Sequence, residues 1–131
     1  MKAGFVFLLT GIICFLSSCD KSDKEKLTQK WQLQTITIKA TEETHNSDSI
    51  FFNFQKEMFQ YQRVSDSNNV YSAYGFFERN GDSIQIQYIN NNLDPALLLW
   101  NEMNKSFYVK HLSGKRLELE DEEVVYKLRS F

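Results

Sequence analysis

The sequence predicts an all-β domain, namely a small eight-stranded antiparallel up-and-down barrel with one short helix, preceded by a signal peptide. From Lys30 onward, polar residues alternate with β-branched and aromatic ones, which is typical of half-buried strands. Clusters of turn residues recur at short intervals, which favours hairpins and an antiparallel meander. One proline and five glycines argue against a low-complexity chain. Eight strands can close into a barrel that is filled or holds one small ligand, and a two-sheet sandwich is the main alternative.

The alternation places each strand in turn. In the first strand, Trp31 and Leu33 share one face whereas Ile36 and Ile38 share the other, so we expect a bulge or bend near Gln34. The clearest strand is 83–89, with Ile, Ile and Tyr on one face and Gln on the other. Strands are expected over residues 30–38, 50–54, 58–64, 70–79, 83–89, 106–112, 115–120 and 123–131.

Two sequence signals separate these strands most strongly. Asn80-Gly81-Asp82 between two alternating runs predicts a hairpin. Asp94-Pro95 predicts the start of a helix, because aspartate is a preferred N-cap and proline suits the first helical position. We expect this helix to cover Pro95–Met103 and to pack on the barrel, since leucines and Trp100 cover much of its surface.

The N-terminal residues predict export. Lys2 precedes an apolar run from Phe5 to Leu16, which is too short to span a bilayer and fits the core of a signal peptide. Leu16-Ser17-Ser18-Cys19 resembles the lipobox of bacterial lipoproteins. This resemblance implies a signal peptide over 1–18 and lipidation of Cys19, followed by a polar tether to residue 26 and the barrel domain over 27–131. A short uncleaved anchor with an incidental cysteine is the alternative.

Lipidation implies a place in the cell envelope. Two acyl chains already give stable anchoring, so a lipidated domain should stay on its membrane. Asp20 follows the cysteine directly. It resembles an inner-membrane retention signal of enterobacterial lipoproteins, but also the surface-export signal of Bacteroidetes lipoproteins. We expect the outer membrane rather than the inner one, with the domain facing the periplasm or the cell surface.

Composition and motifs favour neither catalysis nor a metal or cofactor. Cys14 leaves with the signal peptide and Cys19 takes the lipid, so no thiol remains for a disulfide, a metal or a nucleophile. His45 and His111 lack partners at ligand spacing, and no Gly-x-Ser-x-Gly or phosphate loop is present. The acidic residues of 118–123 indicate a solvated hairpin tip more than a calcium site. A net charge of −2 argues against nucleic-acid binding.

Two short segments resemble the lipocalin-like lipoproteins that are common in Bacteroidetes. Leu27-Thr28-Gln29-Lys30-Trp31 looks like the entry motif of the lipocalin superfamily, with Gln29 where glycine is expected. The stretches 112–119 and 126–131 look like its last two strands. The resemblance implies that Trp31 stacks on Arg129 and closes the barrel floor, with a cation–π contribution of about 0.5–2 kcal/mol.

The surplus of aromatic residues is the feature that points to a function. Apolar pockets with a few polar tips are the usual small-molecule sites, so these rings are candidates for lining a barrel cavity. The alternative is that they only fill the core. The candidate lining residues are Phe52, Phe54, Tyr61, Tyr74, Phe76, Tyr88, Trp100, Phe107 and Tyr126.

These observations predict a lipid-anchored, non-enzymatic envelope protein that binds a small apolar ligand. The runner-up is an accessory module with a filled core that docks on an envelope partner, and an enzyme ranks third. An interior cavity above roughly 300 Å³ would favour the first. A filled core with an exposed aromatic patch would favour the second, and a buried acid or base facing a pocket would favour the third.

Overall fold

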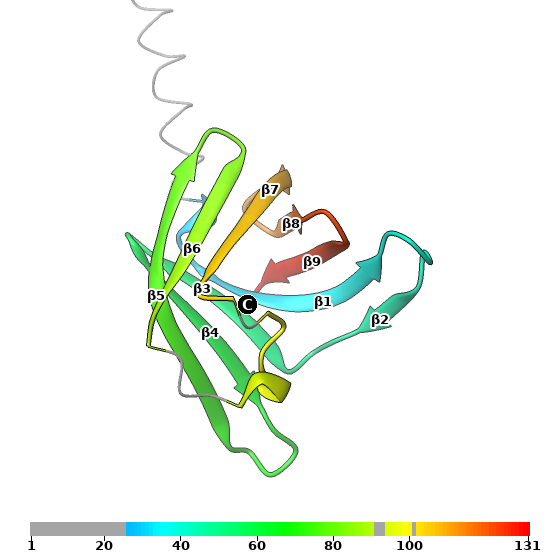
Figure 1. Ribbon diagram of the computed structural model, residues 1–131, viewed down its shortest axis with the longest axis vertical. Coiled ribbons are helices and arrows are strands. Elements are labelled where there is room, and N and C mark those ends of the chain that lie inside the picture. The colour runs from blue at the N-terminus through cyan, green and yellow to red at the C-terminus, as the bar shows by residue number, and fades with distance from the viewer. Residues whose placement is uncertain (1–25, 91–93, 101) are drawn as a thin grey trace, which may run out of the picture.

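One antiparallel sheet closes on itself in the computed structural model (Figure 1), which describes residues 26–90, 94–100 and 102–131. The sheet order is β2-β1-β3-β4-β5-β6-β7-β8-β9, and the additional pairing of β1 with β9 completes the barrel. The predicted barrel is therefore confirmed. The strands are β1 (Lys30–Ile38), β2 (Thr44–Asn46), β3 (Ile50–Gln55), β4 (Met58–Val64), β5 (Val70–Asn80), β6 (Ser83–Asn90), β7 (Asn104–Leu112), β8 (Arg116–Glu120) and β9 (Val124–Ser130).

Three features of the sequence analysis fall outside the described residues. They are the signal peptide over 1–18, the lipidation site Cys19, and the tether up to residue 25. The described residues contain no helix with the length and hydropathy needed to cross a bilayer.

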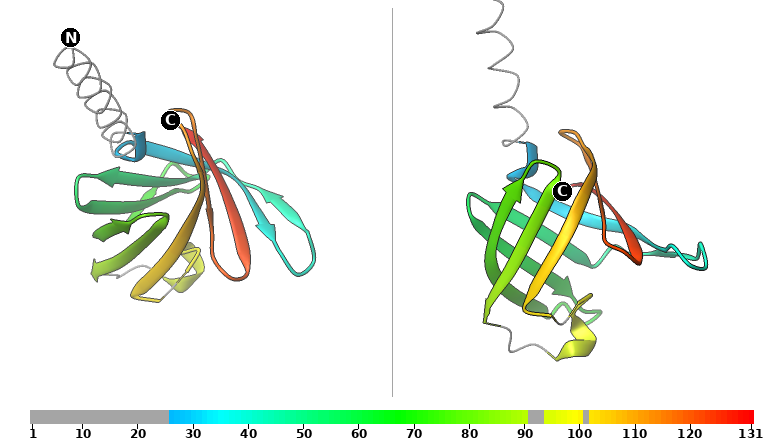
Figure 2. Two further views of the ribbon diagram at one scale, coloured as in Figure 1. Left: turned by 90° about the horizontal axis from the view of Figure 1, so that it is seen from above. Right: turned by 45° about the horizontal axis from the view of Figure 1, so that its top comes forward.

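β1 pairs with three strands, β2, β3 and β9, and it contains the expected bulge. Its pairing with β9 shifts register between Leu33 and Thr35, so Ile36 packs against the same core as Leu33. The first residues of β1 pair with β3, and Thr35–Thr37 pair with β2. The short β2 was not predicted, because Thr44-His45-Asn46 carries no apolar alternation. Figure 2 shows the β1–β2 hairpin projecting beyond the barrel wall.

The hairpin predicted at Asn80-Gly81-Asp82 is confirmed. Asn80 pairs with Ser83, and Gly81 has a φ of +59°, a conformation that glycine adopts without steric cost. In β6, Ile84, Ile86 and Tyr88 are buried while Gln85 and Gln87 are exposed, as the alternation predicts.

The prediction of a helix over Pro95–Met103 is wrong in its length, because the observed element is shorter. Only a 3-10 turn, η1 (Pro95–Leu97), forms, and Leu98 is already extended with φ −104° and ψ 147°. The predicted start is correct, because the Asp94 carboxylate accepts a hydrogen bond from the Ala96 N–H and Pro95 follows it. The chain leaves the helical path so that Trp100 enters the barrel, where it is 5% exposed. Tertiary burial thus outweighs local helix propensity.

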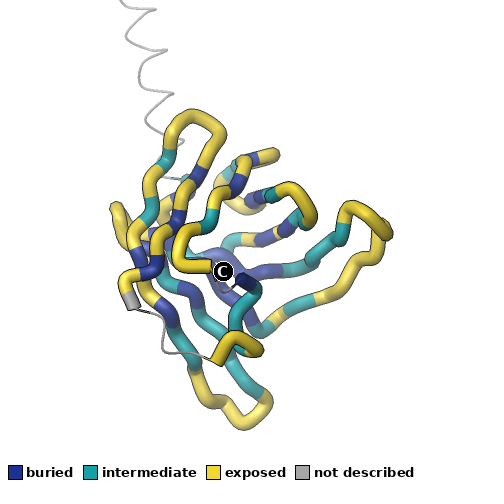
Figure 3. The backbone as a smooth tube through the Cα atoms, viewed as in Figure 1, coloured by how far each residue is buried: buried dark blue, intermediate teal, exposed yellow. Residues whose placement is uncertain are grey.

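Buried and exposed residues alternate along the strands that surround the barrel interior (Figure 3). The core in this interior consists mainly of aromatic and branched aliphatic side chains. Strand alternation sends every second side chain inward, so each strand contributes to one shared cluster. Fully buried large side chains include Trp31, Phe52, Phe54, Phe59, Tyr61, Tyr88, Phe107, Leu33, Ile84, Ile86, Leu117 and Leu119.

The barrel floor is closed differently from the expectation. Trp31 is fully buried and its Nε1 donates to the Leu27 carbonyl at 3.1 Å. Arg129 pairs in register with Gln32 and its Nε donates to Gln32 Oε1 at 3.1 Å. Because neighbouring residues of a strand face opposite sides, Arg129 lies on the outer face and does not stack on the inward Trp31. The predicted stacking is wrong, although both residues lie on the closing β1–β9 pair.

Gln29 strengthens this floor from the position where a glycine was expected. Its Nε2 donates to the carbonyl oxygens of Lys26 at 2.7 Å and Gly114 at 3.2 Å, and its Oε1 accepts from the Ser130 hydroxyl at 2.6 Å. One side chain therefore ties the chain entry, the β7–β8 turn and the end of β9 together.

Candidate functional site

The candidate site is the barrel interior around Trp100. This side chain comes from the segment between β6 and β7, not from a strand, and it enters a cage of five rings. It stacks on Tyr88 at 5.8 Å and on Phe59 at 6.2 Å between ring centroids. Edge contacts complete the cage: Phe52 at 5.6 Å, Tyr61 at 5.9 Å and Phe107 at 5.3 Å. The strands alone therefore leave a space of about one aromatic ring system, which the chain's own indole fills.

Most of the predicted lining residues meet in this interior. Tyr126 contacts Phe107 at 5.3 Å and Phe52 at 6.5 Å, and Phe54 contacts Phe59 at 5.1 Å. The predicted residues found in the interior are Phe52, Phe54, Tyr61, Tyr88, Trp100, Phe107 and Tyr126.

Tyr74 and Phe76 do not belong to this site. They are 51% and 49% exposed on the outer face of β5, the same face as the exposed Glu78. The inward positions of this strand hold the small residues Ala73 and Gly75. A Cβ on Gly75 would lie 2.2 Å from the Gln87 carbonyl oxygen, so β5 and β6 approach each other only because this residue is glycine.

Phe59 is a member of the cage that sequence reasoning missed. It faces the interior together with Tyr61, and its ring contacts Phe52, Phe54, Tyr88 and Trp100. The signal was present, because Phe59 and Tyr61 occupy alternate positions of a correctly predicted strand.

Two buried polar atoms belong to the cage, the Tyr88 hydroxyl and the Trp100 Nε1. Neither forms a hydrogen bond with the part of the chain that the structure describes. A buried unsatisfied group of this kind costs about 1–3 kcal/mol. Burial raises the pKa of Tyr88 far above its usual value, with Tyr61 adding to the effect, so its hydroxyl stays protonated as a potential donor.

Tyr61, the other tyrosine that contacts Trp100, has a hydrogen-bond partner and holds the incoming segment. The Tyr61 hydroxyl donates to the Leu97 carbonyl at 2.9 Å, and Arg63 donates to the Ala96 carbonyl at 3.3 Å. Burial raises the pKa of Tyr61 to about 12, although the Arg63 charge opposes this rise. These contacts attach η1 to β4 beside the point where Trp100 enters.

A polar pair lies on the inner face close to these rings. Lys105 shares the inward side of β7 with Phe107, and its Nζ lies 2.9 Å from the Asp121 carboxylate and 5.7 Å from the Phe107 ring centroid. The Tyr126 hydroxyl donates to the same carboxylate at 3.3 Å. Burial alone would raise the pKa of Asp121, but Lys105 and two backbone N–H groups outweigh burial and lower it. Burial first, and then the Asp121 charge, raises the pKa of Tyr126.

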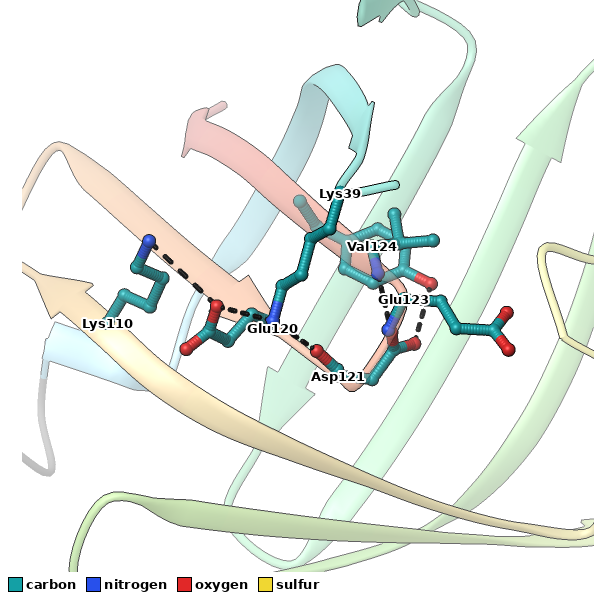
Figure 4. Close-up of polar contacts among 7 residues, drawn as sticks. Lys39, Lys110, Glu120, Asp121, Glu123 and Val124 are labelled. Atoms are coloured by element: carbon teal, nitrogen blue, oxygen red, sulfur yellow. Dashed lines mark hydrogen bonds and ion pairs between the residues drawn. The ribbon is translucent and has the colours of Figure 1, made fainter. Parts of the chain in front are cut away.

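The neighbouring acidic hairpin is organised by lysines (Figure 4). Glu120 lies 2.9 Å from Lys39 and 3.9 Å from Lys110, and the Lys39 ammonium also donates to the Asp121 carbonyl at 2.7 Å. The Asp121 carboxylate accepts from the N–H groups of Glu123 and Val124, both at 2.8 Å. Among the described residues, no group of three or more His, Cys, Asp or Glu side chains is arranged to hold a metal.

An open groove of about 1120 Å³ lies over β5–β7 and the β3–β4 turn. Its lining includes exposed polar and charged residues such as Lys56, Glu57, Glu78, Gln85 and Gln87. The ring cage is buried and apolar by contrast. The cage is filled by the indole of Trp100, so an apolar ligand can bind there only where this side chain withdraws.

A closed meander with an aromatic interior and a few inward polar groups defines the class of small up-and-down barrels that can hold ligands inside. A family model described as "Lipocalin-like domain" matches residues 14–131. The chain belongs to this lipocalin-like family, and the resemblance found in its first and last strands is confirmed.

Solved structures from Bacteroides support the assignment. A lipocalin-like protein from Bacteroides uniformis ATCC 8492 is 28% identical, with a TM-score of 0.74, and the match covers 81% of this chain and 99% of that one. An uncharacterized protein from Bacteroides eggerthii DSM 20697 shares the fold at 23% identity, with a TM-score of 0.71 and coverage of 80% and 99%. No curated protein matches the chain.

Proposed function

We propose that this protein is a lipid-anchored envelope lipoprotein whose barrel binds a small apolar, ring-containing ligand in the space that Trp100 fills. The observation that supports the proposal is the origin of Trp100 in a connecting segment. A side chain from such a segment can withdraw without breaking a strand pairing, whereas Phe52 or Tyr88 cannot. The ligand takes the place of the indole among the five rings.

The Tyr88 hydroxyl and the Trp100 Nε1 favour the replacement of the indole by a ligand. A ligand with an acceptor atom satisfies the Tyr88 hydroxyl, and a displaced Trp100 returns its Nε1 to water. Lys105 and Asp121 offer a charged pair near Phe107 for a polar group of the ligand. The expected ligand is thus an apolar ring body with one or two polar groups, bound without chemical conversion.

The proposed anchor at Cys19 holds the domain on a membrane. We place the protein at the outer membrane, with the domain facing the periplasm or the cell surface. Labelling the host with a palmitate analogue tests this part alone. The wild-type chain should take up label and Cys19→Ala should not, and label on Cys19→Ala would overturn the assignment of the anchor.

Native mass spectrometry of the protein purified from its own host tests ligand binding. We expect an added mass on the wild-type protein that corresponds to one small ring compound, because the indole occupies a space of about one ring system. A variant with a larger inward side chain, Ala73→Phe, crowds the interior and should lose this mass while circular dichroism still reports strands. An adduct retained by Ala73→Phe, or no adduct on wild-type protein from any growth condition, would contradict the proposal.

A second function is favoured by the outer face of β4–β6. Met58, Tyr74, Phe76 and Ile89 are exposed there, and Met58 pairs directly with Phe76. Exposed apolar groups that gather on one face mark interaction sites. An accessory module that docks on an envelope protein through this face is therefore the second candidate. In the same mass spectra it predicts a protein partner, which the double variant Tyr74→Ser, Phe76→Ser should lose.

A further inference from the structure

The two ends of the barrel carry opposite charge. At the end where β1 starts, the basic residues are Lys26, Lys30, Lys56, Arg79, Lys115, Arg116 and Arg129, against the acidic residues Glu57, Glu78 and Asp82. At the opposite end, the acidic residues are Glu42, Glu43, Asp48, Asp66, Asp94, Glu102, Glu120, Asp121, Glu122 and Glu123, against Lys39, Arg63, Lys105 and Lys110. We call the first the basic end and the second the acidic end.

Backbone and side-chain contacts show that the basic end is one continuous surface. Gln29 donates to the Gly114 carbonyl in the β7–β8 turn, and the Gln29 carbonyl accepts from the Phe54 N–H next to the β3–β4 turn. Both views of Figure 2 place the start of β1, the C-terminus and the β7–β8 turn at the same end. Residues far apart in the sequence thus combine into a single charged face.

Several of these basic groups are available to a partner. Lys56, Lys115 and Arg116 are exposed and form no ion pair within the described parts of the chain. Phe131 is 71% exposed beside them, and Lys30 lies 5.2 Å from its ring centroid. An exposed ring among cations is the composition expected of a surface that meets lipid headgroups.

We propose that the basic end docks on an anionic lipid surface. The length of the connecting chain argues for this partner. Only six residues lie between Lys26 and the expected lipid on Cys19, and the fully extended chain from Cys19 to Lys26 reaches about 25 Å. The anchor therefore holds the basic end, not the acidic end, against the bilayer. Anionic headgroups attract Lys and Arg, and the acidic end is repelled to the far side.

The barrel lies between these two ends. β1 has nine residues, so the β1–β2 hairpin tip is about 30 Å from the basic end. This distance is about three Debye lengths at 0.1 M salt. Charges placed at the tip are therefore a matched control, because they change the net charge but not the field at the docking surface.

The test uses residues 20–131, which lack the lipidated cysteine, so its result does not depend on the anchor. The B. uniformis relative matches 81% of this chain along 99% of its own length, so a barrel of this extent folds by itself. We expect this chain to sediment with phosphatidylcholine vesicles only when they contain phosphatidylglycerol, and to be released by salt. Each basic residue near the surface strengthens binding about fivefold, so Lys115→Gln, Arg116→Gln should weaken it about 25-fold.

The control variant Ala40→Glu, Thr41→Glu changes the net charge by the same amount at the exposed hairpin tip, and should bind within about twofold of the wild type. Equal weakening by both variants would show a net-charge effect and overturn the docking surface. Equal binding to vesicles with and without phosphatidylglycerol, or no binding at low salt, would also overturn it. None of these results bears on the ligand in the barrel, so the two proposals fail separately.

Discussion

Replacing Trp100 by alanine is the perturbation that examines the barrel interior most sharply. The indole is 5% exposed and contacts five rings, so its removal should cost about 3–5 kcal/mol of folding free energy. The variant no longer buries an unpaired Nε1, which offsets part of this loss, so we expect the lower part of the range. For a domain of this size, 3 kcal/mol lowers the melting temperature by at least about 12 °C.

The same variant should gain a binding site. A dry cavity on the order of 150 Å³ lined by apolar side chains binds benzene in another protein, and the emptied ring cage is of a similar kind. Indole at 100 times its Kd should therefore restore about 2.7 kcal/mol to Trp100→Ala. Thermal unfolding followed by circular dichroism, with and without indole, measures both effects.

Trp100→Phe is the matched control, because it keeps a ring in the cage and removes only the unpaired Nε1 and part of the volume. It should lose less stability than the alanine variant and gain less from indole. A melting temperature of Trp100→Ala equal to that of the wild type would refute the placement of Trp100 inside the barrel. Equal stabilisation of wild type and Trp100→Ala by indole would refute the cage as its binding site.

Three further predictions concern the floor and the inward polar pair. Trp31→Ala should cost about 3–5 kcal/mol in urea unfolding, whereas Arg129→Ala should change stability by less than about 0.5 kcal/mol because its side chain is on the outer face. Equal losses of stability in the two variants would instead support stacking of Arg129 on Trp31, which the structure does not show. Gln29→Ala should cost about 1–3 kcal/mol by the same measurement, because it leaves two carbonyls and the Ser130 hydroxyl without this partner; no loss would mean that water replaces it. The pKa of Asp121 is lowered on folding, so its contribution is present above the unfolded value of 3.8 and is lost as the pH falls through the lower folded value. Asp121→Asn should therefore flatten the acid branch of a stability–pH curve, and an unchanged branch would contradict the assigned pKa shift.

Most of the strands could be predicted from the alternation of polar and apolar residues, because a half-buried strand has one apolar face and one polar face. The bounds of β1 and β4 were predicted to the residue, and the bulge in β1 was visible as a change of phase between Leu33 and Ile36. The β2 strand could not be predicted in this way. Its residues are all exposed and polar, so its pairing with β1 leaves no hydrophobic pattern.

The errors at the site arise from tertiary contacts that a local pattern does not contain. Asp94-Pro95 correctly marks a helical start, but the burial of Trp100 ends the helix after Leu97. Tyr74 was assigned inward because it is aromatic, although it shares a face with Glu78. Its neighbours Ala73 and Gly75 are the inward residues, and their small size leaves room inside the barrel. The pairing of Lys105 with Asp121 has no signal in the sequence, because the two residues come from separate elements, β7 and the β8–β9 turn.

The most direct test of the central claim observes Trp100 itself while ligand binds. The chain has two tryptophans, so Trp31→Phe leaves Trp100 as the single emitter. Its fluorescence should resist iodide quenching in the ligand-free protein, because the indole is 5% exposed. Adding the molecule that co-purifies from the host should make Trp100 accessible to iodide in proportion to occupancy. A fluorescence that is quenched freely without ligand, or that stays protected at full occupancy, would contradict a ligand site in the space of the indole.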